Sequence, residues 1–160
     1  MIHFRCQHAE ALRMRVDVMS KMRGVDLFAK LWKRRTTLQI PGGEQYDLLS
    51  LPDLVQAKKT QRDKDWPMIR RLVEANFFEN RRKPSPAQIR FWLAELRTPQ
   101  LLTEVARKNP VAAKKLAGQR PLLRLALAGE PDKLEKAMAD EERAERESDR
   151  RYWQIGRAHV

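Results

Sequence analysis

The sequence predicts an α+β fold for the first half of the chain and an all-α extension for the second half. Two observations support this prediction. Apolar residues alternate with polar ones over residues 12–19, which is the period of a β-strand. After residue 80, six prolines separate short segments whose apolar residues recur every three or four positions, as they do in helices. We therefore expect one domain over residues 10–79 and a helical extension over residues 80–150.

The charge of the chain favours an anionic partner. The 160 residues carry a formal net charge of +12, which is unevenly distributed. Residues 1–40 sum to +6, residues 41–129 to +8 and residues 130–150 to −4. A basic body predicts a partner such as a nucleoside triphosphate or a nucleic acid, although scattered cations on a solvated surface explain the same numbers.

No part of the sequence has the character of a membrane or secretory segment. The longest apolar runs are far shorter than the roughly 20 residues that a membrane helix needs, and the first ten residues lack the apolar core of a signal peptide. Cys6 is the single cysteine and the three histidines are scattered, so neither a disulfide framework nor a cysteine–histidine metal cluster is expected. We expect a cytoplasmic protein with no membrane partner.

Turn and capping residues place the next elements of the first half. Asp26 can cap a short helix over residues 27–32. Residues 37–40 and 45–49 are predicted to be the two strands of a hairpin, because the turn residues Pro41-Gly42-Gly43 separate them.

Two helix starts follow this hairpin. Ser50 is the expected N-cap of the first helix, with Pro52 in the first turn and Asp53 as a variant of the capping box. Asp65 is expected to cap the second helix, with Pro67 in its first turn. The apolar stripe of the second helix consists of Ile69, Leu72, Val73 and Phe77.

The second half begins with a basic, proline-rich segment, NRRKPSPAQ at residues 80–88, which is expected to be the boundary between the domain and the extension. Near the end, residues 135–151 are strongly charged and contain few large apolar side chains. This composition predicts a solvated helix.

The order of the elements resembles a known family. A strand with RVDVM, a hairpin ending in YDLLSLPDLVQAKK and the segment TQRDKDWPMIRRL resemble the latter part of minimal nucleotidyltransferases of the DNA polymerase beta superfamily, which includes proteins of bacterial toxin–antitoxin modules. The resemblance covers about residues 12–78 and is most specific over residues 48–72. It implies a mixed sheet with helices packed on it, and three carboxylates that hold divalent metal.

Asp17 is the residue to which the resemblance assigns chemistry. The apolar-acid-apolar pattern of Val16-Asp17-Val18 matches the third carboxylate of the family, which implies that Asp17 is a catalytic residue and a ligand of Mg²⁺. The metal neutralises triphosphate charge and helps to activate the attacking hydroxyl. The strand period also places Asp17 on the face opposite to Val16 and Val18. Taken alone, the residues favour the alternative, a weak surface ion pair with Arg13 or Arg15.

Two basic residues form a second candidate site. The resemblance implies that Lys58 and Arg62 lie near the nucleotide, where they can pair with phosphate or with a carboxylate. The alternative is that Lys58 and Arg62 make surface pairs along a helix, while Lys64 is a solvated side chain and Asp65 serves only as a cap.

The family's other active-site elements are missing from the sequence. There is no Gly-Ser motif followed by an acidic pair before Asp17. We therefore expect the C-terminal part of an N-terminally truncated nucleotidyltransferase, which transfers a nucleotide to an unknown acceptor when complete and is inactive alone. Residues 155–160, IGRAHV, match the translation of a sequencing-library adapter, so residues 151–160 are expected to be a non-native tail.

Three other functions remain open. The chain can be a non-catalytic basic module that binds nucleic acid or a partner protein. It can be an antitoxin-like protein that binds another chain through the helical extension. A metal-dependent nuclease using Asp17, Asp47 and Lys58 is disfavoured, because Lys58 lies on a predicted helix rather than beside an acid on one strand.

Overall fold

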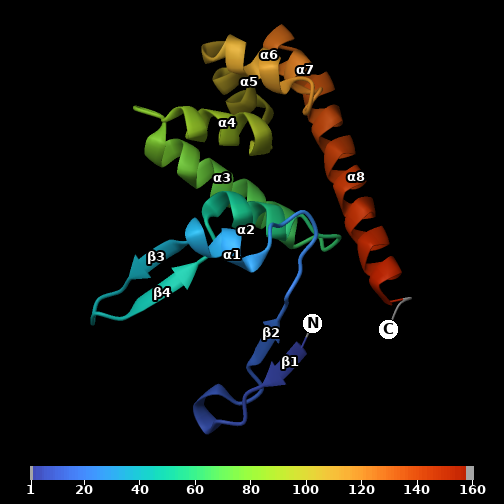
Figure 1. The fold of residues 1–160 in the computed structure, drawn as a ribbon. Helices are drawn as coiled ribbons and strands as arrows, with labels where there is room; N and C mark the ends of the chain where they lie inside the picture. The colour runs from blue at the N-terminus through green and yellow to red at the C-terminus, as the bar shows by residue number, and fades with distance from the viewer. Residues whose placement is uncertain (1, 158–160) are drawn as a thin grey trace. The chain divides into compact units, whose positions relative to one another are not determined.

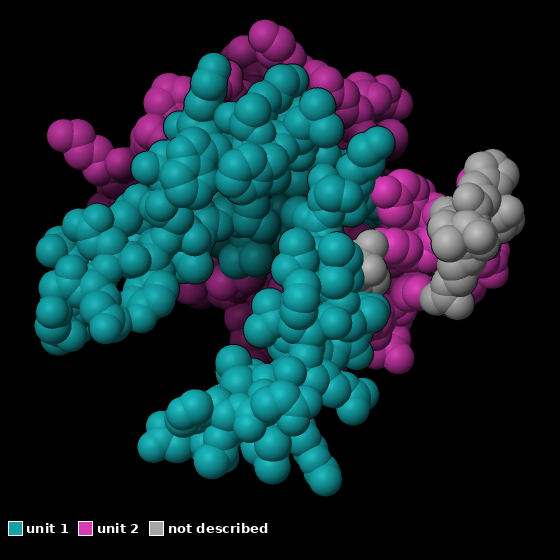
Figure 2. Space-filling view, turned by 60° about the horizontal axis from the view of Figure 1, so that its bottom comes forward, with its two compact units in different colours: residues 1–57 teal, residues 58–160 magenta. Residues whose placement is uncertain are grey.

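The computed structural model describes residues 2–157 and divides the chain into two compact units, Met1–Ala57 and Lys58–Val160 (Figure 2). The fold is α+β, as the sequence predicts, with the strands in the first unit and most of the helices in the second (Figure 1). The boundary expected near residue 80 lies between two helices of the second unit.

The first unit consists of two hairpins, a single turn of 3₁₀ helix and two α-helices. Its elements are β1 (Ile2–Arg5), the 3₁₀ turn (Ala9–Ala11), β2 (Arg15–Val18), α1 (Phe28–Lys33), β3 (Thr36–Gln39), β4 (Gln45–Leu48) and α2 (Leu51–Lys58), which ends one residue beyond the unit boundary. Strand β1 pairs with β2 and β3 pairs with β4, both antiparallel, as two separate two-stranded sheets. The mixed sheet implied by the family resemblance is therefore not formed by residues 2–157. Each strand pairs with its neighbour in the chain, because closing a short loop costs the least conformational entropy.

The first hairpin differs from the strand that the sequence predicts. The ladder begins at Arg15 rather than at residue 12, because Arg13 has a φ of +67°, which interrupts the extended run. The Cys6 N–H donates to the Met14 carbonyl at 2.8 Å and closes the hairpin above this kink. Strand β1 was not expected, because four residues are too few for a periodic signal.

The second hairpin confirms the sequence prediction. Gly42 and Gly43 have φ values of +114° and +90°, which residues with a Cβ rarely adopt. The turn is closed by two hydrogen bonds, from Gly43 N–H to the Ile40 carbonyl and from Ile40 N–H to the Glu44 carbonyl, each of 3.1 Å. All residues of the four strands are exposed, because neither hairpin has a second layer of structure to cover its apolar face.

A fork of hydrogen bonds joins α1 to α2. Arg34 follows α1 and donates from Nε and Nη2 to the two carboxylate oxygens of Asp53, at 2.6 and 2.5 Å. Asp53 also accepts a hydrogen bond from the Ser50 hydroxyl at 2.5 Å, and its own N–H donates to that hydroxyl at 3.4 Å, which confirms Ser50 as the predicted cap. Asp26 does not cap α1 as expected, since its carboxylate pairs with Arg34 at 2.8 Å and Lys30 at 3.5 Å.

The second unit is helical. Its helices are α3 (Asp65–Asn80), α4 (Pro86–Glu95), α5 (Pro99–Lys108), α6 (Pro110–Leu116), α7 (Leu123–Ala128) and α8 (Pro131–Arg157). Four of them begin with a proline, whose missing N–H and fixed φ suit the first helical position. Ser85 and Gln88 also form a complete capping box at the start of α4. The prolines that suggested short helices therefore mark their first residues.

The core of this unit is built on α3 and α4. The side chains of Trp66, Ile69, Val73 and Phe77 lie on the buried face of α3. Phe77 meets Trp92 of α4 edge to face, with ring centroids 5.1 Å apart. The indole N–H of Trp92 donates to the Asn76 side chain at 2.9 Å, so the buried ring leaves no polar atom without a partner.

The predicted charged helix corresponds to α8, which is less solvated than expected. Leu134 and Met138 are buried, and Asp149 is only 3% exposed and accepts the Gln61 N–H at 2.9 Å. The helix continues through the expected non-native tail as far as Arg157, and residues 158–160 lie outside the described part. Within residues 2–157, no helix combines the length and the apolar character needed to cross a bilayer.

A buried arginine connects three parts of the second unit. Arg120, which is 6% exposed, donates to the carbonyls of Leu93 and Leu96 at 2.9 and 3.0 Å. These carbonyls belong to the C-terminal end of α4, where no helical N–H is available to them. Arg120 also binds both oxygens of Glu141 on α8, at 3.0 and 2.9 Å.

Glu141 is shared with a second arginine. Arg97 approaches Glu141 at 3.3 Å and its guanidinium lies 4.6 Å from the centre of the Trp66 ring. Burial raises the pKa of Glu141, but the hydrogen bonds and charge of Arg120 outweigh it, with help from Arg97, and the net pKa is lowered. The glutamate is therefore ionised at neutral pH.

Replacing Arg120 with methionine should destabilise the second unit by about 3 kcal/mol, because Glu141 loses its main partner and two helix-end carbonyls lose their donor. Urea unfolding followed by tryptophan fluorescence measures this change. The control is Arg124→Met, which removes an exposed arginine from α7 and should change the unfolding free energy by less than about 0.5 kcal/mol. Equal effects of the two substitutions would contradict the proposed role of Arg120.

Candidate functional site

The polar face of the first hairpin holds Asp17. Strand register places His3 opposite Asp17, and alternation places Arg15 on the same face. The Asp17 carboxylate accepts a hydrogen bond from Arg15 Nε at 2.6 Å and lies 2.6 Å from His3 Nδ1. The apolar side chains of Val16 and Val18 lie on the other face, as the sequence predicts. The surface ion pair allowed by the sequence is therefore formed, and its partner is Arg15.

The neighbours of Asp17 keep its carboxylate ionised. The hydrogen bond from Arg15, followed by the one from His3, lowers the pKa of Asp17 below its usual range. Arg15 also approaches His3 Nδ1 at 3.0 Å, so the three side chains form one exposed cluster. A single carboxylate does not complete a site for Mg²⁺, because this ion takes several oxygen ligands. Within residues 2–157, no group of three or more acidic, histidine or cysteine side chains could hold a metal ion.

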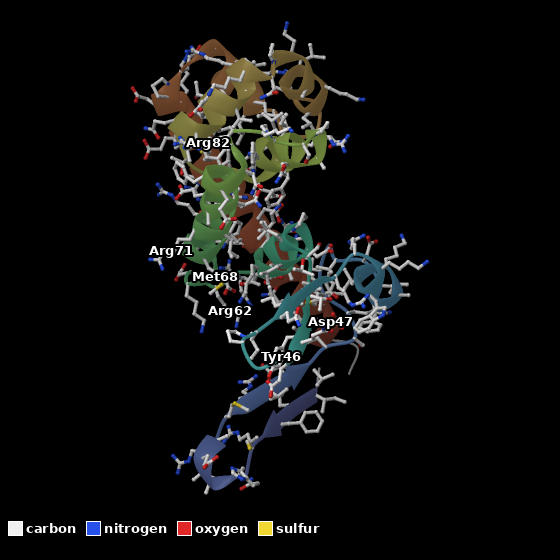
Figure 3. All side chains as sticks on the ribbon, turned by 90° about the vertical axis from the view of Figure 1, so that its left-hand side faces the viewer. Tyr46, Asp47, Arg62, Met68, Arg71 and Arg82 are labelled. Atoms are coloured by element: carbon white, nitrogen blue, oxygen red, sulfur yellow. The ribbon has the colours of Figure 1, made fainter. Side chains whose placement is uncertain are left out.

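Asp47 lies on the other hairpin and has its own partners. Its carboxylate accepts a hydrogen bond from the Thr37 hydroxyl at 2.6 Å and pairs with Arg35 Nε at 2.9 Å. Figure 3 labels Asp47 beside Tyr46 on β4. The hydrogen bond from Thr37 is the main cause that lowers the pKa of Asp47. Asp17 and Asp47 belong to separate sheets and each is paired with its own arginine, so these two acids do not form the pair that the nuclease alternative needs.

Lys58 and Arg62 meet at the corner between α2 and α3, where both face Asp65. Lys58 Nζ lies 3.6 Å from one carboxylate oxygen, and Arg62 Nε donates to the other at 3.0 Å. That second oxygen also accepts the Thr60 hydroxyl at 2.5 Å. The structure thus pairs the two predicted phosphate ligands with a carboxylate.

Asp65 does more than cap a helix. It is the first residue of α3 rather than its N-cap, which is Lys64, and it is only 1% exposed. Burial raises its pKa, but the hydrogen bond from Thr60 and the charges of Arg62 and Lys58 more than compensate, so the net pKa is lowered. An ionised, buried Asp65 holds the corner that precedes α3.

A basic strip on α3 was missed by the sequence analysis, which considered only the buried stripe of that helix. We define the α3 strip as the exposed side chains of Met68, Arg71, Phe78, Arg81, Arg82 and Lys83. Met68, Arg71 and Arg82 follow one side of α3 in Figure 3. The spacing of residues 68, 71, 75, 78 and 82 could have predicted this strip, because it repeats the helical period on the side away from the core.

The second unit also has a cavity of about 370 Å³. Its lining mixes acids, bases and apolar side chains: Arg70, Arg97, Pro99, Gln100, Glu135, Met138, Ala139 and Glu142. Its two arginines are already engaged, Arg70 with Glu74 at 2.9 Å and Arg97 with Glu141. The lining therefore does not select one class of ligand.

Comparison with known proteins adds no relative: no family model, curated protein or solved structure matches the chain significantly.

Replacing Arg15 with glutamine should raise the pKa of Asp17 toward the usual value for aspartate, and more than His3→Gln does, because the Arg15 hydrogen bond contributes most to the shift. Side-chain carboxyl NMR titration measures this. Because the pKa of Asp17 is lower in the folded hairpin than in the unfolded chain, its ionised carboxylate stabilises the hairpin at pH values above the unfolded pKa. This stabilisation is lost as the pH falls through the folded-state pKa. An unchanged pKa in Arg15→Gln would contradict the assigned pairing.

Replacing Asp65 with asparagine should lower the unfolding free energy at neutral pH by about 2 kcal/mol, because a buried charged acceptor is removed from Thr60 and Arg62. The difference should narrow as pH falls through the depressed pKa of Asp65, since the wild-type carboxyl is then also neutral. Urea unfolding at several pH values measures both effects. Glu79→Gln is the control, because Glu79 is an exposed carboxylate of the same helix with no ion pair to a described residue.

Proposed function

We propose that this chain carries one carboxylate of a nucleotidyltransferase-type site, Asp17, and does not transfer nucleotides by itself. The observation that supports the proposal is the state of Asp17. It is ionised, lies on the polar face of a strand between two apolar residues, and has a guanidinium rather than a second acid as its partner. This combination fits a metal-ligand position whose companion acids are supplied by other residues than the described ones.

The proposal explains the role of the two neighbours of Asp17. A carboxylate that binds a metal ion must be deprotonated and correctly oriented, and neighbouring groups can provide both. Arg15 and His3 do both through their contacts of 2.6 Å with the same carboxylate oxygen. In the proposed complete site, Asp17 and two further carboxylates would hold the metal, which would neutralise charge on the triphosphate.

Lys58 and Arg62 are not part of the proposed site. Both are directed at Asp65, which is buried, and their charges hold its carboxylate ionised. A phosphate at this corner competes with an internal carboxylate, so we assign the two side chains to the stability of the second unit.

The proposal predicts that activity depends on Asp17 only when the missing elements are supplied. The test is an in-frame fusion of this chain to the strand–helix–strand of a minimal nucleotidyltransferase that carries the Gly-Ser motif and the acidic pair. With Mg²⁺ and radiolabelled nucleoside triphosphates, the fusion should label an acceptor and the unfused chain should not. The Asp17→Asn substitution should lower the transfer rate of the fusion by at least about a thousandfold, since the metal provides several kcal/mol of transition-state stabilisation.

Asp47→Asn is the matched control for Asp17→Asn, because both aspartates are exposed strand residues paired with an arginine. The control should leave the rate of the fusion unchanged. Paramagnetic broadening by Mn²⁺ gives a second readout: Asp17 resonances should broaden in the fusion and not in the unfused chain. Nucleotide transfer by the unfused chain, or full activity of the Asp17→Asn fusion, would refute the proposal.

A further inference from the structure

The two faces of α3 differ in what they offer to a ligand. The inner face is buried in the core, whereas the outer face exposes 44% of Met68 and 52% of Phe78. Arg71 lies between them in the helical repeat, and Arg82 continues the same line beyond the end of the helix (Figure 3). From Arg71 to Arg82 the strip extends for about 16 Å at the helical rise.

The cations of the α3 strip differ from several arginines of the second unit that pair with acids. Arg71, Arg81, Arg82 and Lys83 form no ion pair with any carboxylate in the described part of the chain. By contrast, the arginines elsewhere in this unit that do have acidic partners include Arg62, Arg70, Arg97, Arg120 and Arg146. Glu79 is an exposed acid beside these four cations. The net charge of this short surface is therefore about +3.

Phe78 gives the strip an aromatic surface as well as charge. The Arg81 guanidinium lies 5.3 Å from the centre of the Phe78 ring, and the Phe77 ring meets it edge to face with centroids 5.3 Å apart. These contacts hold the ring while half of the residue remains exposed. A ring held in this way is a preformed surface for stacking, because ordering it on binding costs little further entropy.

A ligand that satisfies both features carries repeated negative charge and flat rings. Single-stranded nucleic acid has both, since its phosphates pair with arginine and lysine and its bases stack on aromatic side chains. A duplex keeps its bases stacked inside and leaves Phe78 without a partner. An anionic membrane surface is less suitable, because Arg71 and Arg82 lie in line with the apolar side chains rather than beside them.

We propose that the α3 strip binds single-stranded nucleic acid, with Arg71, Arg81, Arg82 and Lys83 at the phosphates and Phe78 stacked on a base. This inference does not depend on the nucleotidyltransferase proposal, because Asp17 belongs to the other unit. The two can therefore fail separately.

The test is fluorescence anisotropy of a labelled 20-nucleotide oligouridine with the full chain at several salt concentrations. Replacing both Arg81 and Arg82 with glutamine should weaken binding and reduce the slope of log K against log salt by about 1.4, since each phosphate contact to a single strand contributes about 0.7. The matched control is Lys114→Gln with Lys115→Gln, which removes the same charge from exposed positions on α6. The control should leave the slope unchanged.

The stacking contact is tested separately from charge. Phe78→Leu should weaken binding by about tenfold at every salt concentration without changing the slope, whereas Phe78→Trp should restore the affinity. Phe78 is half exposed, so both substitutions should leave the thermal midpoint of the chain unchanged.

Four outcomes would overturn the proposal. The first is that Phe78→Leu binds oligouridine with wild-type affinity, and the second is that the Lys114/Lys115 control loses as much affinity as the Arg81/Arg82 variant. The third is that the chain binds duplex RNA as tightly as oligouridine. The fourth is that it binds phosphatidylserine vesicles more tightly than oligouridine. The proposal is established if the affinity depends on salt and falls in Phe78→Leu and in the Arg81/Arg82 variant but not in the Lys114/Lys115 control.

Discussion

The helical unit depends on one buried cation, the guanidinium of Arg120. Four hydrogen bonds join this guanidinium to two helix-end carbonyls and to both oxygens of Glu141, and they offset the cost of burying the charge. Arg97 shares Glu141 and covers the Trp66 ring, which extends the network to the start of α3. The end of α4, the segment before α7 and the middle of α8 are therefore fixed by the same contact. This rigidity keeps α3 in place and gives its outer face a defined surface.

The first unit has no comparable centre. Its buried side chains are few, and the Arg34–Asp53 fork joins only α1 and α2. Both hairpins leave their apolar faces in contact with solvent, and the aspartates Asp17 and Asp47 are each paired with an arginine. A polar face that is already paired can present a carboxylate such as Asp17, but it supplies no second acid. Under our two proposals, the first unit contributes one ligand position, Asp17, and the helical unit contributes the binding surface of the α3 strip.

Predictability followed the range of the contacts involved. The β3–β4 hairpin and the Ser50–Asp53 cap were predictable, because glycine backbone freedom and side-chain capping depend on residues three or four positions apart. The polar orientation of Asp17 was predictable from strand alternation alone. The pairing of Asp17 with His3 was not predictable, because alternation within a strand does not specify which strand lies beside it. The mixed sheet implied by family resemblance did not form among the described residues, since resemblance of segments does not specify which strands pair.

The sequence by itself determined the α+β class, the proline-marked starts of the helices and the excess of positive charge. These properties depend on local backbone preferences and on composition, which need no knowledge of distant contacts. Only the tertiary structure decided that Lys58 and Arg62 pair with Asp65 and that Arg120 binds carbonyls 24 and 27 residues away. It also decided that the cations of the α3 strip have no acidic partner among the described residues. Whether a charge is neutralised depends on which segments fold against it, and packing of the core sets that arrangement.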